Sequence, residues 1–209
     1  MMLWVLVALL QAAPALWVER DGAQLRLSSD LSGLFDDALI HRLTSGLTTT
    51  LHLRLAVRVF PDGASAGETW RTARVRWELW DEKVTAIVDG PEGAHTESYP
   101  TVRAFVVAFG RVDALVVASG IPTDEQTYRA EARLEVNPLT PDQVARMRRW
   151  LAAPRPDALD PLSGSLLGSF VRFFDNLKPG VAERVLRVES HPFRADRLPF
   201  HRGALHGPP

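Results

Sequence analysis

Residues 47–60 read LTTTLHLRLAVRVF, and apolar and polar side chains alternate along most of this stretch. Every second residue from Leu51 to Val59 is leucine or valine, which places one apolar row on one side of an extended chain. A period of two predicts a β-strand with one face in the core and the other in water. The same alternation returns in residues 69–80, TWRTARVRWELW, so the two segments predict a long antiparallel hairpin closed by the loop at 61–68.

Shorter patterns on both sides of this hairpin predict further strands and helices. Strands are expected as a hairpin at 17–29 around Asp21-Gly22, and at 83–89, 128–136 and 183–190. Apolar stripes and capping residues predict helices at 30–46, 102–110, 140–152 and 165–177. Residues 90–100 are expected to form turns, and residues 115–118 fit either a helix or a short strand. We therefore predict an α+β fold, an antiparallel β-sheet or sandwich-like meander with three to four packed helices.

The N-terminal segment has the pattern of an export signal. Residues 1–18 carry no charged side chain, and the apolar run at 3–10 is followed by QAAPA at 11–15. This order predicts a signal peptide, residues 1–15, that is cleaved after Ala15. An uncleaved membrane anchor and a buried first strand are the alternatives. We expect residues 16–190 to form a single α+β domain and residues 191–209 to form a flexible tail rich in Pro, His and Arg.

Composition removes several classes of function. The 24 Lys and Arg residues nearly balance the 25 Asp and Glu residues, so the net charge of −1 gives no electrostatic basis for binding nucleic acid. The sequence contains no cysteine, which excludes disulfides, thiolate zinc sites, iron–sulfur clusters and cysteine nucleophiles. We predict neither a nucleic-acid partner nor a cofactor.

Three short motifs resemble catalytic or metal sites but lack the required context. Residues 63–67, GASAG, fit the G-x-S-x-G elbow of hydrolases, but that motif needs a strand-to-helix turn and a strand follows here. Asp37 and His41 lie four residues apart, with His52 as a third candidate ligand, but no established metal-binding spacing supports them. His-Thr-Glu at 95–97 matches a fragment of the zinc deaminase signature without its cysteines. The sequence therefore predicts no catalytic residue and no metal site.

Basic side chains on the polar face of the long hairpin are the candidate anion-binding site. We call them the arginine strip, and its members are His52, Arg54, Arg58, Arg74 and Arg76. Guanidinium groups in a row can hold carboxylate or phosphate groups through paired hydrogen bonds. The alternative is a solvated surface on which Glu78, Glu131 and Glu135 balance the charge.

A second candidate surface lies in the amphipathic segment 165–177. Three phenylalanines and several leucines form its apolar side, which could dock on a membrane surface or on another envelope protein. Packing of this segment against the protein's own sheet is the alternative. The candidate interaction residues are Leu166, Phe170, Phe173 and Phe174.

The order of these features resembles a family of exported bacterial proteins of unknown function. The resemblance rests on the leader, the pattern ALxxxLxxGL at 38–47, WELWD at 77–81, YRAEAR at 128–133, LTPDQ at 139–143 and ESHPF at 189–193. It implies a periplasmic or envelope location and supplies no catalytic residue. We expect a non-enzymatic binding or structural interaction module with an envelope protein or the membrane surface as partner. The alternative is a small exported hydrolase or ligand-binding enzyme whose site is assembled from distant loops.

Overall fold

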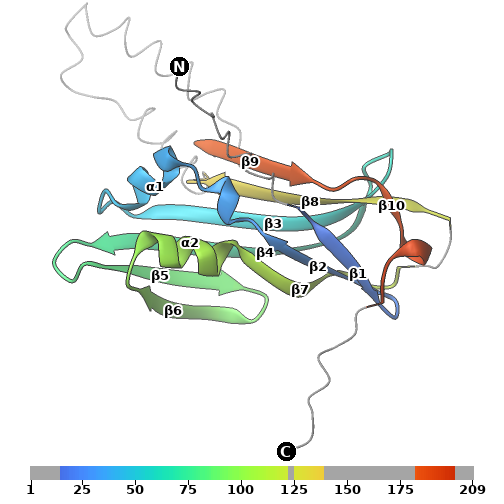
Figure 1. Cartoon of the computed structure of the whole chain (residues 1–209), viewed down its shortest axis with the longest axis horizontal. Coiled ribbons are helices and arrows are strands. Elements are labelled where there is room, and N and C mark those ends of the chain that lie inside the picture. Colours follow the sequence, from blue (N-terminus) through green and yellow to red (C-terminus); the bar gives the residue numbers. More distant parts are fainter. Residues whose placement is uncertain (1–14, 122–124, 139–181, 201–209) are drawn as a thin grey trace, which may run out of the picture.

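The computed structural model describes residues 15–121, 125–138 and 182–200, which form two antiparallel sheets and two short α-helices. The smaller sheet contains β1 (Trp17–Asp21), β2 (Gln24–Asp30) and β7 (Arg111–Ala118) in the order β1-β2-β7. The larger sheet contains β3 (Thr49–Val59), β4 (Ser65–Glu78), β5 (Lys83–Gly90), β6 (Gly93–Tyr99), β8 (Thr127–Val136), β9 (Arg184–Glu189) and β10 (Phe193–Arg194). Figure 1 shows the smaller sheet and the helices in front of the larger sheet.

The predicted long hairpin lies at the centre of the larger sheet. β3 pairs with β4 along nearly its whole length, with Leu55 opposite Thr69, so this prediction is confirmed. On its other side β3 pairs with β8, and β9 and β10 both pair with β8 along one edge. The strand order is β10-β8-β3-β4-β5-β6, which places β6 at the opposite edge.

The hydrophobic core lies between the two sheets. The alternation in β3 and β8 turns one face of each strand inward, as period-two patterning requires. The smaller sheet and the second helix cover this face. Fully buried side chains include Leu25, Leu27, Leu51, Leu53, Leu55, Val57, Phe105 and Leu134.

The two sheets approach each other closely at Gly67 of β4. A Cβ atom at this position would lie 2.5 Å from the carbonyl oxygen of Val117 and 2.6 Å from the Cα of Ala118 in β7. Any larger residue would therefore overlap the backbone of the facing strand. This packing explains the second glycine of the GASAG motif without a catalytic serine.

The prediction of three to four packed helices is wrong for the described part of the chain, which is dominated by β-sheet and has two α-helices. α1 spans Asp37–Leu43 and α2 spans Val102–Gly110. The apolar stripe expected at 30–46 is largely buried, but Asp36 adopts an extended conformation and caps the helix. Consequently, α1 begins seven residues late and only a single 3-10 turn, η1 (Ser32–Leu34), precedes it. The predicted helices at 140–152 and 165–177 lie outside the described residues.

Two other segments differ from the expected turn and tail. Residues 90–100, expected to form turns, contain β6, which pairs with β5 over its full length. Within the expected C-terminal tail, β10 pairs with β8, a second 3-10 turn η2 (Ala195–Arg197) follows, and the Pro199 carbonyl accepts a hydrogen bond from Arg20 N–H. No helix among the described residues is long and apolar enough to cross a membrane.

Candidate functional site

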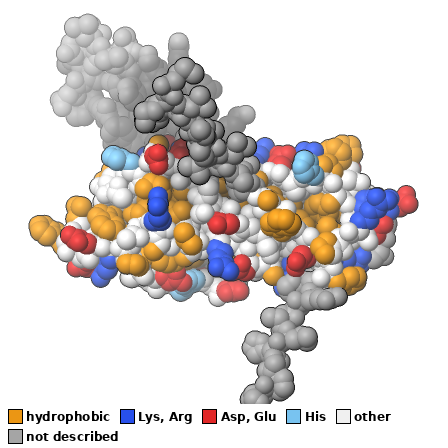
Figure 2. All heavy atoms as spheres, viewed as in Figure 1, with side chains coloured by type: hydrophobic (Ala, Val, Ile, Leu, Met, Phe, Trp, Pro, Cys, Tyr) orange, Lys and Arg blue, Asp and Glu red, His pale blue; other side chains and the backbone are white. Residues whose placement is uncertain are grey.

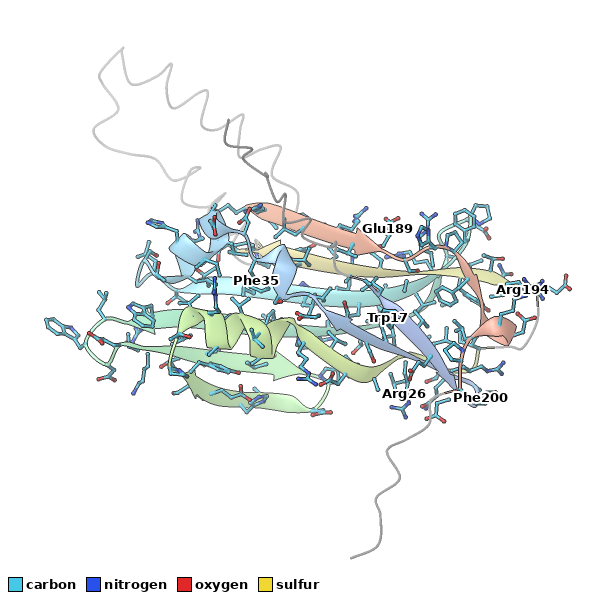
Figure 3. The ribbon with its side chains drawn as sticks, in the orientation of Figure 1. Trp17, Arg26, Phe35, Glu189, Arg194 and Phe200 are labelled. Atoms are coloured by element: carbon cyan, nitrogen blue, oxygen red, sulfur yellow. The ribbon has the colours of Figure 1, made fainter. Side chains whose placement is uncertain are left out.

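A groove of about 710 Å³ opens between the inner face of the larger sheet and the strand β7. We call it the Arg71 groove. One wall consists of inward-facing residues of β4, β5 and β6, and the other consists of the end of α2 and the first half of β7. Arg26 of β2, labelled in Figure 3, lines the groove beside β7. Its members thus come from segments far apart in the sequence.

Arg71 lies in the wall of this groove with its side chain on the inner face of β4. Its Nη2 donates hydrogen bonds to the backbone carbonyls of Phe109 and Arg111 at the end of α2, the latter over 2.7 Å. The guanidinium carbon also lies 4.9 Å from the centre of the Phe109 ring. These contacts hold the guanidinium in place and satisfy carbonyl groups that the helix leaves free at its end.

No described carboxylate forms an ion pair with Arg71, although the side chain is partly buried. Its Nε is enclosed without a hydrogen-bond partner among the described residues, and none of the described hydrogen bonds uses its Nη1. Burial lowers the pKa of the Arg71 guanidinium below its ordinary value, while the negative charge of Asp113 opposes the shift. A cation without a described ion-pair partner therefore lines the groove.

Three polar side chains of β6 line the same wall of the groove as Arg71, two strands away from it. His95, Glu97 and Tyr99 alternate along the strand, so all three lie on its inner face. His95 Nε2 lies 3.0 Å from Glu97 Oε1, and the Tyr99 hydroxyl donates a hydrogen bond to Glu97 Oε2. The HTE fragment thus contributes a histidine–glutamate pair to a groove, although it lacks the cysteines of a zinc deaminase.

Aromatic rings form the apolar part of the site. Phe109 stacks on Phe105 with 5.5 Å between the ring centres, and Phe105 meets Tyr99 edge-on at the same separation. Phe35 completes the row on the far side of Phe109. Since Phe105 is fully buried, this row ties the groove wall to the core and fixes the position of Arg71.

Two other arginines that line the groove are paired within the protein. Arg26 bonds to Asp21, and Arg111 Nε lies 2.8 Å from Asp113 Oδ2. Figure 2 shows acidic and basic side chains interspersed over the face formed by the smaller sheet and helices. Charge on that face alone therefore does not distinguish the site. Arg71 differs from Arg26 and Arg111 because it has no ion-pair partner among the described residues.

The structure places the arginine strip on the opposite, outer face of the larger sheet. Arg54 lies opposite Trp70, Arg58 opposite Ser65 and Arg74 opposite Thr50. Arg74 and Arg76 therefore lie near one end of the hairpin and Arg58 near the other. The five residues share a face but do not converge on one point.

Four members of the arginine strip have acidic partners on the same face. Arg76 pairs with Glu78 at 2.8 Å, Arg58 with Glu131 at 3.4 Å, His52 with Glu135 at 3.6 Å and Arg54 with Glu68 at 4.0 Å. Arg74 makes no ion pair with the described residues. Anion binding by the strip stays a prediction, and these pairs are competitors that an incoming anion must displace.

The remaining sequence candidates contribute little to a described site. Asp37 and His41 are exposed on α1, His52 is on β3, and no group of three or more His, Cys, Asp or Glu among the described residues is placed to hold a metal ion. Ser65 starts β4 and does not line the Arg71 groove. The candidate interaction residues Leu166, Phe170, Phe173 and Phe174 lie outside the described residues.

Compared with known proteins, the chain matches no family model, no curated protein and no solved structure. The resemblance to the exported bacterial family therefore stays a prediction. Any assignment of function depends on the residues and geometry of the chain itself.

Proposed function

We propose that the protein is an exported, non-enzymatic binding module of the cell envelope that holds an anionic ligand in the Arg71 groove. The observation that carries this proposal is the partly buried guanidinium of Arg71, which forms no ion pair with any described carboxylate. Burying a charge without an ion-pair partner costs free energy, so an anion that enters the groove gains a favourable interaction.

The groove walls narrow the chemistry of that ligand. A volume of about 710 Å³ lies within the range of small-molecule sites, about 300–1,000 Å³. Phe109, Val112 and Leu115 offer apolar contacts, and Arg71 offers its guanidinium, whereas His95 and Tyr99 are already bonded to Glu97 in the same lining. A carboxylate or phosphate group attached to an apolar body matches this combination.

Export is the second part of the proposal. It is supported by the uncharged leader, by the QAAPA sequence at 11–15 and by the resemblance to an exported family. The described fold begins directly after this sequence, because β1 starts at Trp17 and Leu16 packs against the core. Cleavage after Ala15 would leave every strand intact.

Calorimetric titration with decanoate, which joins a carboxylate to an apolar chain, tests the binding site. We expect the parent chain to bind decanoate and to bind decanol at least about tenfold more weakly, because a charge-assisted hydrogen bond contributes about 1.5–3 kcal/mol. Arg71→Met keeps an aliphatic side chain on Phe109 and removes the charge. This variant should lose affinity for decanoate by about tenfold or more while its circular dichroism stays unchanged.

The matched control is the double variant Arg74→Ala/Arg76→Ala on the outer face. It should bind decanoate like the parent if the anion sits in the groove. Lost affinity in this control, with Arg71→Met unaffected, would assign the anion to the arginine strip instead. Equal binding of decanoate and decanol by the parent would contradict an anionic ligand without recourse to any variant.

A small hydrolase is the second candidate, and the His95–Glu97 pair is the observation that favours it. A carboxylate that orients a histidine is a common part of a general base. The described lining residues include no serine, and their hydroxyl groups belong to Thr69 and Tyr99. Thr69 is buried, and Tyr99 already bonds to Glu97, so we rank this function below binding.

A further inference from the structure

The strand β6 forms one edge of the larger sheet. β5 pairs with it from Gly93 to Tyr99, and no described strand pairs with its other side. The opposite edge differs, because β10 has only two residues and β9 carries the charged residues Arg187 and Glu189. At the edge of the smaller sheet, Arg20 of β1 bonds to Pro199 and bridges to Phe200.

β6 lacks several of the features that usually prevent edge strands from pairing with another chain, although Glu97 places a charged side chain on its inner face. Its sequence, GAHTESY, contains neither lysine nor proline, and its pairing with β5 shows no bulge. On the outer face it presents the small residues Ala94, Thr96 and Ser98, all exposed. A strand placed beside β6 would therefore meet no bulky or like-charged obstacle on that face.

The hairpin geometry defines which backbone groups point outward. Gly90 and Gly93 flank the two-residue turn between β5 and β6 and face each other, as a hydrogen-bonded pair does in such a hairpin. Because the pattern alternates, His95, Glu97 and Tyr99 direct their N–H and C=O groups toward β5. The N–H and C=O groups of Ala94, Thr96 and Ser98 therefore point to the free edge.

A second copy of β6 complements this edge when the two strands run antiparallel about Thr96. Thr96 then faces its own counterpart and Ala94 faces Ser98, so that these residues exchange backbone hydrogen bonds. On the inner face His95 of each copy lies opposite Glu97 of the other. The arrangement creates two histidine–glutamate cross-strand pairs and one threonine pair, all of which stabilise antiparallel strands.

The ends of β6 select this register. With Thr96 on the two-fold axis all seven residues of one strand pair with all seven of the other. A shift of two residues in one direction places Ala94 opposite Pro100, which has no N–H to donate. A shift in the other direction places Ser98 opposite Glu92 in the turn and shortens the overlap.

We propose that β6 is a homodimer interface through which two copies of the chain join their larger sheets into one continuous antiparallel sheet. His95, Glu97 and Tyr99 line the Arg71 groove, so the dimer would bring the two grooves side by side across the two-fold axis. The inference depends on the edge chemistry of β6 and not on the ligand proposed for the groove.

Sedimentation equilibrium of the chain tests the interface. We expect a monomer–dimer equilibrium for the parent, and Thr96→Lys should raise the dimer dissociation constant about tenfold or more because two lysines would meet at the axis. The control Thr85→Lys makes the same substitution on the same face of β5, one strand away from the edge, and should dimerise like the parent. A monomeric parent, or dimers that persist in Thr96→Lys, would overturn the proposal.

A charge-exchange experiment tests the register independently of folding defects. His95→Glu and Glu97→His should each dimerise poorly alone, since Glu would face Glu in one and His would face His in the other. Mixed at about pH 6, where histidine is commonly protonated, the two variants should form heterodimers detectable by native mass spectrometry. A His95–Glu97 contact within one chain cannot make the two variants form heterodimers. Failure of the mixture to associate would therefore contradict the proposed register.

Discussion

At the scale of single residues, sequence reasoning missed Arg71, although its position in the alternating pattern of β4 marks it as unusual. Arg71 shares its strand face with Ala73 and Val75, both of which are buried. A charged residue in the apolar phase of an alternating strand indicates a special environment. The arginine strip was visible in the sequence because several basic residues share one strand face, whereas Arg71 is a single residue. The groups that Arg71 contacts lie in α2 and β7, and the periodicity of β4 gives no information about contacts with those elements.

Gly67 permits a specific prediction about packing between the sheets. Gly67→Ala should lower the free energy of unfolding by about 3 kcal/mol, because its Cβ would overlap backbone atoms of β7 that cannot move independently. Gly90→Ala is the control, since its Cβ would meet its nearest neighbour at 3.4 Å, an ordinary contact. Urea denaturation of both variants provides the measurement. Equal stabilities would show that the sheets separate without cost at Gly67.

At the scale of elements, strands with strict alternation were predicted well, whereas β6 was missed. β3, β5, β8 and β9 all lie within two residues of their predicted positions, and β4 begins four residues earlier than predicted. β6 was taken as turn because glycines, a proline and small polar residues dominate residues 90–100. Pairing with β5 stabilises this segment as a strand, although its own composition does not favour one. The late start of α1 has a local cause, because Asp36 adopts an extended conformation and caps the helix by accepting a hydrogen bond from Leu39 N–H.

Asp36 links α1 to β9 and makes that contact dependent on pH. Its Oδ1 accepts hydrogen bonds from Leu39 N–H and from Arg184 Nη1, at 3.0 and 2.7 Å. The Arg184 bond and the Leu39 bond lower the pKa of Asp36 from 3.8 to about 2. A carboxyl group with a lowered pKa in the folded state stabilises the fold above about pH 4, and this contribution disappears as the pH falls toward 2.

Asp36→Asn keeps a capping side chain but removes the titratable group. The parent should therefore be more stable than Asp36→Asn at neutral pH, and the difference in urea midpoints should shrink between about pH 4 and pH 2. Asp37→Asn, at the adjacent exposed position, serves as the control because it also removes a carboxylate from the start of α1 but leaves the contact between Asp36 and Arg184 in place. If the difference in urea midpoint between the parent and Asp36→Asn stays constant across this pH range, the Asp36–Arg184 ion pair is not its source.

At the scale of the whole molecule, the sequence specified the faces of the strands but not their neighbours. A period of two shows which side chains turn inward, whereas pairing partners depend on contacts between distant segments. β8 lies beside β3 although about 70 residues separate them, and β7 joins β2 instead of the larger sheet. The groove forms between segments that are distant in the sequence, so no local sequence motif predicts it.

The start of the fold also permits a test of the predicted cleavage after Ala15. Ser29 is buried, and its hydroxyl donates a hydrogen bond of 2.8 Å to the Ala15 carbonyl, which cleavage removes. A chain released from a fusion tag to begin at Leu16 should therefore fold with all its strands but unfold with about 1 kcal/mol less free energy than one beginning at Ala15. Ser29→Ala should cost a similar amount in the longer chain and almost nothing in the shorter one. Ser28→Ala is the control, because the Ser28 hydroxyl accepts a hydrogen bond from Ala114 N–H in either chain and the loss of this bond should cost both chains equally.

N-terminal sequencing of the secreted protein should find Leu16 as the first residue. A chain that begins at Leu16 and fails to fold would refute cleavage at this position.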